Sequence, residues 1–196
     1  MSRLIFAILL CTLQVNAFAE NKTAVFAGGC FWCMEKPYDK VDGVISTISG
    51  YTGGHTENPT YQQTSTGTTG HYEALEVTYD ANKVRYKKLL DVFWKNIDPF
   101  DARGQFCDKG PQYRAAIFTN DENETELANE SKQALQDKLK DKATIVTEVL
   151  PAKKFYPAEE YHQDYYKKNP VRYRYYRYGC GRDKRLDEVQ KLINSN

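Results

Sequence analysis

Apolar and polar residues alternate along the chain in patterns that predict both strands and amphipathic helices. Short β-branched or apolar runs bounded by turn residues predict strands at 23–27, 43–51, 72–80, 113–118 and 144–150. Helices are predicted at 34–41, 85–97, 121–140, 157–168 and around Leu186, Val189 and Ile193. Two long polar loops, 52–70 and 98–112, separate these elements. Loops of this length in a compact domain often carry function.

The strand predicted at 72–80 places a carboxylate among apolar side chains. Side chains on a strand alternate between its two faces, so Leu75, Val77 and Tyr79 share one face. Glu73 has the same parity. Burial on a core-facing side raises the pKa of a carboxyl, which can then hold a proton near neutral pH. The alternative is that the strand end frays and Glu73 turns to water without a function.

Length and composition favour one folded domain preceded by a targeting segment. A chain of 196 residues with 41% hydrophobic content can bury one core, and no repeat or linker is visible. Residues 1–19 are typical of a cleaved signal peptide, with Arg3, an apolar run from Leu4 to Leu13, and Ala17-Phe18-Ala19 before Glu20. We therefore expect a single catalytic domain at 20–196, exported to the periplasm or secreted.

Charge and composition exclude several classes of partner. Without Arg3, the predicted mature chain has 26 basic residues, 27 less 1, and 26 acidic residues. Such a balanced charge favours neither a polyanion nor an anionic membrane. The tract at 172–178 alternates arginine with tyrosine and could stack on single-stranded nucleic acid. We favour tyrosines packed on the domain instead, and expect a monomer that binds neither nucleic acid nor membrane.

The candidate chemistry centres on Gly28-Gly29-Cys30-Phe31-Trp32-Cys33. An apolar strand followed by a glycine pair and a helix would place Cys30 near a helix N-terminus. There, free backbone N–H groups and the helix dipole favour a thiolate. The sequence therefore predicts a nucleophilic or redox-active Cys30 beside two aromatic residues and a second thiol.

Other roles for these cysteines remain open. A lone cysteine is often only a small buried apolar residue, and a C-x-x-C pair also occurs in zinc sites and in thioredoxin-like proteins. Zinc is disfavoured because no second C-x-x-C follows and the remaining candidates are scattered. These are Cys107, Cys180, His55, His71 and His162. In an oxidising compartment the four mature cysteines could also form structural disulfides.

Several segments together resemble the peptide methionine sulfoxide reductase A family. Gly28-Gly29-Cys30-Phe31-Trp32 with Glu35 is similar to the family signature. Further segments agree in order and spacing, at 49–54, 58–61, 70–74, 108–114 and 155–163. The set extends across most of the mature chain. The resemblance implies an α+β fold with a ferredoxin-like split β-α-β two-layer sandwich and a long C-terminal coil.

The resemblance also implies an activity and a set of site residues. The activity is reduction of the S epimer of methionine sulfoxide, free or in proteins, with no metal or organic cofactor and with a thioredoxin-like dithiol as reductant. By position, Cys30 is the nucleophile, Phe31 and Trp32 bind the substrate methyl, Glu73 is the acid, and Tyr61 and Tyr113 bind the sulfoxide oxygen near Asp108. A sulfoxide sulfur is a poor electrophile until its oxygen is protonated or strongly hydrogen-bonded, so the reaction needs these donors.

A second thiol must then convert the Cys30 sulfenic acid into a disulfide. Cys33, where many relatives have glycine, is favoured by proximity, with Cys180 and Cys107 as alternatives. A rival function is a thiol–disulfide oxidoreductase that uses the pair Cys30 and Cys33. A zinc-stabilised binding module is the third hypothesis.

Overall fold

The computed structural model describes residues 20–195. Within this range the largest sheet has six strands in the order β7-β6-β1-β3-β2-β8. Every pairing is antiparallel except that of β6 with β7. Its strands are β1 (Asn21–Gly28), β2 (Val44–Thr52), β3 (Tyr72–Asp80), β6 (Ala115–Thr119), β7 (Glu148–Pro151) and β8 (Tyr156–Pro157). A separate hairpin joins β4 (Gly104–Gln105) to β5 (Asp108–Lys109).

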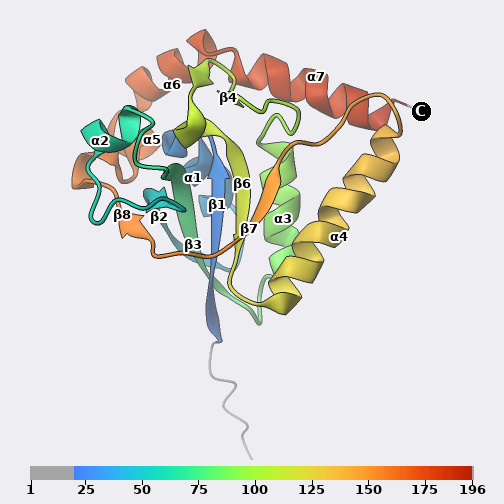
Figure 1. The fold of residues 1–196 in the computed structure, drawn as a ribbon, viewed down its shortest axis with the longest axis horizontal. Helices are drawn as coiled ribbons and strands as arrows, with labels where there is room; N and C mark the ends of the chain where they lie inside the picture. Colours follow the sequence, from blue (N-terminus) through green and yellow to red (C-terminus); the bar gives the residue numbers. More distant parts are fainter. Residues whose placement is uncertain (1–19, 196) are drawn as a thin grey trace, which may run out of the picture.

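The helices follow the strands in a split β-α-β arrangement (Figure 1). They are α1 (Phe31–Asp39), α2 (Tyr61–Ser65), α3 (Tyr86–Lys95), α4 (Glu122–Leu139), α5 (Tyr165–Lys168), α6 (Pro170–Gly179) and α7 (Arg182–Asn194). Helix α1 connects β1 to β2, and α3 connects β3 to β6. The four strands joined in this way lie in the order β6-β1-β3-β2, which confirms the ferredoxin-like α+β prediction.

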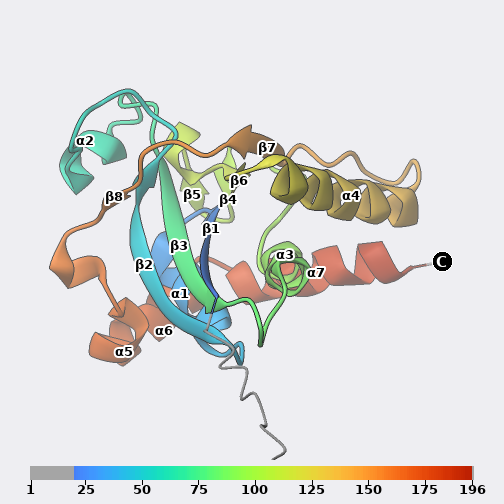
Figure 2. The ribbon, with the colours of Figure 1, turned by 90° about the horizontal axis from the view of Figure 1, so that it is seen from below.

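The main core lies between one face of the sheet and the helices α1 and α3 (Figure 2). Phe26 on β1 stacks on Tyr38 of α1 and on Phe93 of α3, with ring centroids 5.2 and 5.5 Å apart. Leu75 and Val77 of β3 are fully buried in the same cluster. The predicted alternation along β3 is therefore confirmed. Burial of these side chains, worth about 1.5–3 kcal/mol each, fixes the register that also places Glu73.

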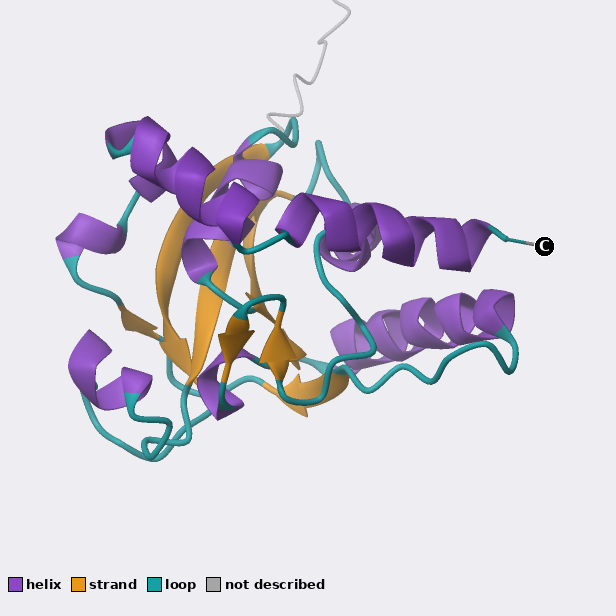
Figure 3. Cartoon of the chain, turned by 90° about the horizontal axis from the view of Figure 1, so that it is seen from above, coloured by secondary structure: helices purple, strands orange, loops and turns teal. Residues whose placement is uncertain are grey.

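The C-terminal region differs from the prediction. Instead of one helix at 157–168, the chain forms β8, a short 3₁₀ turn at Glu160–His162 and then α5. The long C-terminal coil is also wrong beyond this point, because α5, α6 and α7 follow in close succession (Figure 3). Pairing in β7 begins at Glu148, later than predicted. These elements are specified by contacts with distant residues, which local patterns do not encode.

The predicted signal peptide, residues 1–19, lies outside the described residues. From residue 20 to residue 195, no helix combines the length and apolar character needed to cross a membrane.

Candidate active site

Cys30 lies at the junction where β1 passes into α1. It is the N-cap residue of α1 and is buried, with a side chain 6% exposed. The preceding Gly29 has a φ of 78°, and a Cβ atom there would lie 2.5 Å from Cβ of Gln105. Only glycine therefore fits the turn that directs Cys30 inward.

Glu73 faces this turn from β3, where it pairs with Tyr51 of β2. Its Oε2 accepts a hydrogen bond from the backbone N–H of Phe31 at 3.2 Å. Burial raises the pKa of Glu73 to about 8, against the effect of that hydrogen bond. The carboxyl thus holds a proton at neutral pH beside the residue that follows Cys30. The alternative of a frayed strand end is wrong.

A small cavity of about 70 Å³ brings the expected site residues together. Seven of its lining residues were predicted, and Tyr176 of α6 was not. The lining residues are Cys30, Phe31, Trp32, Tyr61, Glu73, Asp108, Tyr113 and Tyr176. They come from segments far apart in the sequence, including α1, α2, β3, the β4–β5 hairpin and α6.

The phenol groups of the cavity remain protonated, and so can donate hydrogen bonds. Burial raises the pKa of Tyr61 and of Tyr113. Tyr61 is the first residue of α2, where its backbone N–H donates to Oε1 of Glu159 at 2.9 Å. Burial also raises the pKa of Asp108, whose Oδ2 accepts a hydrogen bond from the Tyr176 hydroxyl. The cavity therefore contains acids and donors, as binding of an oxygen atom requires.

Trp32 forms an aromatic side of the cavity and is held from two directions. Its Nε1–H donates to Nδ1 of His162 at 3.0 Å, and its ring stacks on Tyr165 with centroids 3.7 Å apart. Burial lowers the pKa of His162, so its neutral imidazole can accept this hydrogen bond. Phe31, which also lines the cavity, packs on Tyr51. Apolar faces of this kind suit a methyl group.

The pKa values of Cys30 and Cys33 differ from the sequence prediction of a thiolate at Cys30. Burial raises the pKa of Cys30 well above its ordinary value, although the sequence predicted a thiolate at this position. A hydrogen bond with Cys30 lowers the pKa of Cys33 to about 6, and Arg182 and Arg177 act in the same direction. Desolvation at Cys30 outweighs the helix N-terminus, and the negative charge of the pair lies on Cys33.

Cys107 and Cys180 form a disulfide in this structure. Cys107 lies in the turn of the β4–β5 hairpin, and Cys180 is the C-cap residue of α6. Together with Asp108 they form the one compact group of potential metal ligands within residues 20–195. Because the two sulfurs are bonded to each other, neither offers the thiolate that a zinc site uses.

Tyr176, His162 and Arg182 contribute to the site and had no assigned role in the sequence. Tyr176 belongs to the Arg/Tyr tract, where nothing distinguishes it from its neighbours. His162 was considered only as a metal ligand. The Arg182 side chain is only 1% exposed. A charged residue at the start of a polar helix would be expected to lie in solvent. Their roles depend on how the C-terminal helices fold back on α1.

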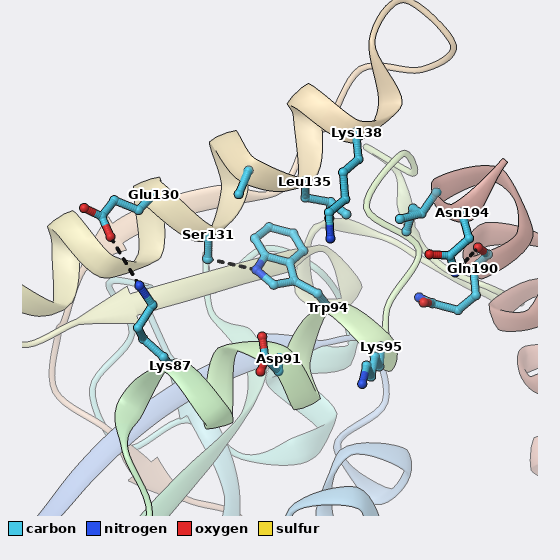
Figure 4. Close-up of a pocket in the computed structure, with 12 residues that line it drawn as sticks. Lys87, Asp91, Trp94, Lys95, Glu130, Ser131, Leu135, Lys138, Gln190 and Asn194 are labelled. Atoms are coloured by element: carbon cyan, nitrogen blue, oxygen red, sulfur yellow. Dashed lines mark hydrogen bonds and ion pairs between the residues drawn. The ribbon is translucent and has the colours of Figure 1, made fainter. Parts of the chain in front are cut away.

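A larger cavity lies elsewhere, between α3, α4 and α7 (Figure 4). It measures about 600 Å³ and contains none of the predicted site residues. Trp94 forms part of it and donates a hydrogen bond to Oγ of Ser131 at 3.0 Å, while Lys87 pairs with Glu130 across its edge. It contains no cysteine or histidine. Cavity size is therefore a poor guide to the reactive site in this protein.

A buried cysteine pair facing a protonated carboxyl defines a thiol-dependent oxidoreductase. A model of the family described as peptide methionine sulfoxide reductase matches residues 22–193. The peptide methionine sulfoxide reductase MsrA of Bacillus licheniformis is 52% identical over 164 residues, covering 84% of this chain and 91% of that protein. The chain therefore belongs to the peptide methionine sulfoxide reductase family.

Solved structures agree with this placement. Methionine sulfoxide reductase A of Corynebacterium diphtheriae is 36% identical and superposes with a TM-score of 0.74, covering 79% of this chain and 78% of that one. Mxr1 from Saccharomyces cerevisiae in complex with Trx2 is 25% identical, with a TM-score of 0.53, covering 74% of this chain and 84% of that one.

Proposed function

We propose that this protein reduces the S epimer of methionine sulfoxide, in peptides or as the free amino acid, through a sulfenic acid on Cys30. The main support for this proposal is that one cavity contains Cys30, the protonated carboxyl of Glu73 and two phenol donors. The aromatic faces of Phe31 and Trp32 would hold the substrate methyl, and the polar side of the cavity would hold the oxygen.

In the first step, the substrate oxygen accepts hydrogen bonds from Tyr61 and Tyr113 and a proton from Glu73. The Cys30 sulfur attacks the sulfoxide sulfur, and the Cys30 proton passes to the Glu73 carboxylate, which lines the same cavity. The oxygen, now a hydroxyl group, moves to the Cys30 sulfur as a sulfenic acid, and its bond to the sulfoxide sulfur breaks together with the transient S–S bond. The sulfoxide sulfur keeps the electron pair and leaves as the thioether of methionine.

In the second step, Cys33 attacks the Cys30 sulfenic acid, which forms a disulfide and releases water. Cys33 is favoured over Cys107 and Cys180 because those two are already joined to each other. An external dithiol then reduces the Cys30–Cys33 disulfide, and no metal or organic cofactor takes part. A thioredoxin-like protein suits this role, since the related Mxr1 forms a complex with Trx2.

We propose further that the protein acts outside the cytoplasm. The proposal is supported by the charged, apolar and small-residue pattern of residues 1–19. Its substrates would then be oxidised proteins of the cell envelope, and the mature chain would be a monomer. Sequencing of the N-terminus from a periplasmic fraction and sedimentation of the purified protein test these points. A mature protein that begins at Met1 would overturn the export proposal.

The test of the activity offers a peptide containing both epimers of methionine sulfoxide and follows each by chromatography. We expect the S epimer to disappear and the R epimer to persist. Mass spectrometry after one turnover should find Cys30 joined to Cys33. A Cys30–Cys180 or Cys30–Cys107 link would reject Cys33 as the resolving thiol.

The same protein should be offered insulin, because a reduced Cys30–Cys33 pair also suits thiol–disulfide exchange. Reduction of insulin without loss of either sulfoxide epimer would favour the thiol–disulfide oxidoreductase over the reductase. The burial of both thiols favours a small substrate group over a protein disulfide.

A further inference from the structure

Arg182 is a fully buried cation without a carboxylate partner. Its side chain is 1% exposed, and among residues 20–195 no carboxylate oxygen lies within 4.0 Å of its guanidinium. Its Nη2 donates to the carbonyl oxygens of Gly28 and Asn96, at 3.0 and 2.7 Å, and approaches Sδ of Met34 at 3.2 Å. Its Nε has no hydrogen-bond partner. Because an unpaired buried charge costs several kcal/mol, an anion close by is expected.

The position of Arg182 identifies that anion. Gly28 lies two residues before Cys30, and Met34 follows Cys33 directly, so the guanidinium lies beside the segment that carries both thiols. The ionisable groups that feel its charge are Cys33, Asp108 and Tyr173. Burial raises the pKa of Asp108 and of Tyr173, although Arg182 lowers both. Cys33 is the group of the three whose pKa is lowered overall.

A second arginine approaches Cys33 from α6. Arg177 forms an ion pair with Asp183, with Nε at 2.9 Å from Oδ1, and its Nη1 donates to the Tyr173 hydroxyl at 3.4 Å. Tyr173 and Cys33 belong to the same buried cluster. The charge of Arg177 helps to lower the pKa of Cys33. The two arginines flank the junction of α6 and α7, and the Cys107–Cys180 disulfide anchors that junction to the hairpin.

We propose that Arg177 and Arg182 are positioning residues that hold the Cys33 sulfur as a thiolate, ready to attack the sulfenic acid formed on Cys30. The role in attack rests on the proposed function. In that step the Cys33 sulfur supplies the electron pair of the new S–S bond, the Cys30 S–O bond breaks, and the hydroxide leaves as water with a proton from Glu73. Only a thiolate can supply that pair, so a positive environment at Cys33 accelerates the step.

The titratable and charged groups near Cys33 come from each element packed on it. Cys30 precedes it at the N-cap of α1, and Glu73 faces it from β3. Helix α5 contributes Tyr165 and Tyr166, α6 contributes Tyr173, Tyr176 and Arg177, and Arg182 begins α7. Protonated Glu73 and protonated Tyr173 carry no charge at neutral pH. The hydrogen bond with Cys30 lowers the pKa of Cys33 most, and the two arginines are the cations that add to this effect.

The test titrates the thiolate of the mature protein by its ultraviolet absorbance between about pH 5 and 8, below the range where tyrosine ionises. The Cys107–Cys180 disulfide stays intact and contributes no thiolate, and Cys33→Ser assigns the signal. We expect Arg177→Gln and Arg182→Met to raise the midpoint from about 6 by about one pH unit or more. Arg177→Lys and Arg182→Lys keep the charge, so their midpoints should stay close to that of the unsubstituted protein.

Arg174→Gln is the matched control, because Arg174 is an exposed arginine of α6 whose Nε donates only to the Pro170 carbonyl. It removes the same charge from the same helix and should leave the midpoint unchanged. Unchanged midpoints in Arg177→Gln and in Arg182→Met would overturn the inference. If Arg182→Met fails to fold, Arg177→Gln and its lysine rescue decide the question.

A second readout separates this inference from the proposed function. After one turnover at pH 6, Arg177→Gln should form the Cys30–Cys33 disulfide about five-fold more slowly, while the sulfoxide step keeps its rate. This factor follows from an ionised fraction that falls from about one half to about one tenth when the pKa rises from about 6 by one unit. A shifted midpoint without sulfoxide reduction would overturn the proposed function alone. Normal turnover with an unshifted midpoint would overturn this inference alone.

Discussion

The protein contains two cysteine pairs that differ in every respect relevant to their chemistry. Cys30 and Cys33 lie three residues apart at the start of α1, are buried, and are thiols. Cys107 and Cys180 lie 73 residues apart, join the β4–β5 hairpin to the end of α6, and form a disulfide. A cysteine becomes reactive here through its neighbours, namely a protonated carboxyl, two phenols and two arginines. The other pair lies beside Asp108, but its sulfurs are bonded to each other and link two segments.

The linking pair also supports the reactive one. The hairpin carries Asp108, next to Cys107, and α6 carries Tyr176, four residues before Cys180. The Tyr176 hydroxyl donates to Asp108, and both residues line the cavity of Cys30. A cross-link between the two segments therefore holds one side of the active site closed. It contributes to position and supplies no reacting atom.

Substitution of the nucleophile Cys30 should give the largest difference in activity between variants of the two cysteine pairs. Cys30→Ser removes the sulfur that accepts the oxygen, so steady-state sulfoxide reduction should fall roughly 10⁴-fold or more. The paired variant Cys107→Ser/Cys180→Ser should keep its single-turnover rate within about ten-fold, because no reacting atom is lost. Measurement of both on the same peptide decides the assignment. Equal losses in the two variants would mean that the second pair takes part in the chemistry.

The linking pair should matter more for stability. A disulfide that closes a loop of 73 residues restricts the unfolded chain and contributes about 4 kcal/mol in the loop-closure estimate. Cys107→Ser/Cys180→Ser should therefore lower the free energy of unfolding by about this amount. Urea denaturation under non-reducing conditions measures it, with Cys33→Ser as a control that breaks no cross-link. A loss below about 1 kcal/mol would show that the link constrains little.

Local patterns in the sequence were sufficient to predict the elements that position Cys30 and Glu73. The alternation of Leu75, Val77 and Tyr79 predicted which face of β3 is buried, and hence that Glu73 points inward. The glycine pair predicted the turn before Cys30. These features depend on side-chain direction along one strand and on the backbone freedom of glycine, both of which are local.

Features that depend on distant contacts were not predictable in this way. The pairing of Cys107 with Cys180 was one of several possible pairings, and the spacing favoured none. The contribution of Tyr176 and the burial of Arg182 follow from α6 and α7 folding back onto α1. The charge of Cys30 was mispredicted because the helix N-terminus is visible in the sequence, whereas the extent of desolvation is known only from the fold.

The pH dependence of the sulfoxide step tests the role of Glu73 beside the reactive pair. An acid donates only while protonated, and the pKa of Glu73 is about 8, so the rate of the sulfoxide step should fall as pH rises through that value. Glu73→Gln should lower the rate about 10²-fold, because the amide donates a hydrogen bond but no proton. It should also remove the decline on the alkaline side. Single-turnover rates from acidic to alkaline pH provide the measurement. An unchanged profile would rule out the acid role.

Tyr113→Phe should have the smallest effect, because it removes one of several donors to the same oxygen. Burial raises the pKa of Tyr113, so its hydroxyl keeps the proton at working pH and acts as a donor only. Loss of one such donor should lower the single-turnover rate about ten-fold, with little change in affinity for the substrate. Tyr61→Phe serves as the matched variant because Tyr61 lines the same cavity and its hydroxyl also keeps its proton. If both donate to one oxygen, the double variant should lose more than either single variant but less than the product of their losses. Strictly multiplicative losses would mean that the two hydroxyls act on separate atoms, and the oxygen site proposed between them would then be wrong.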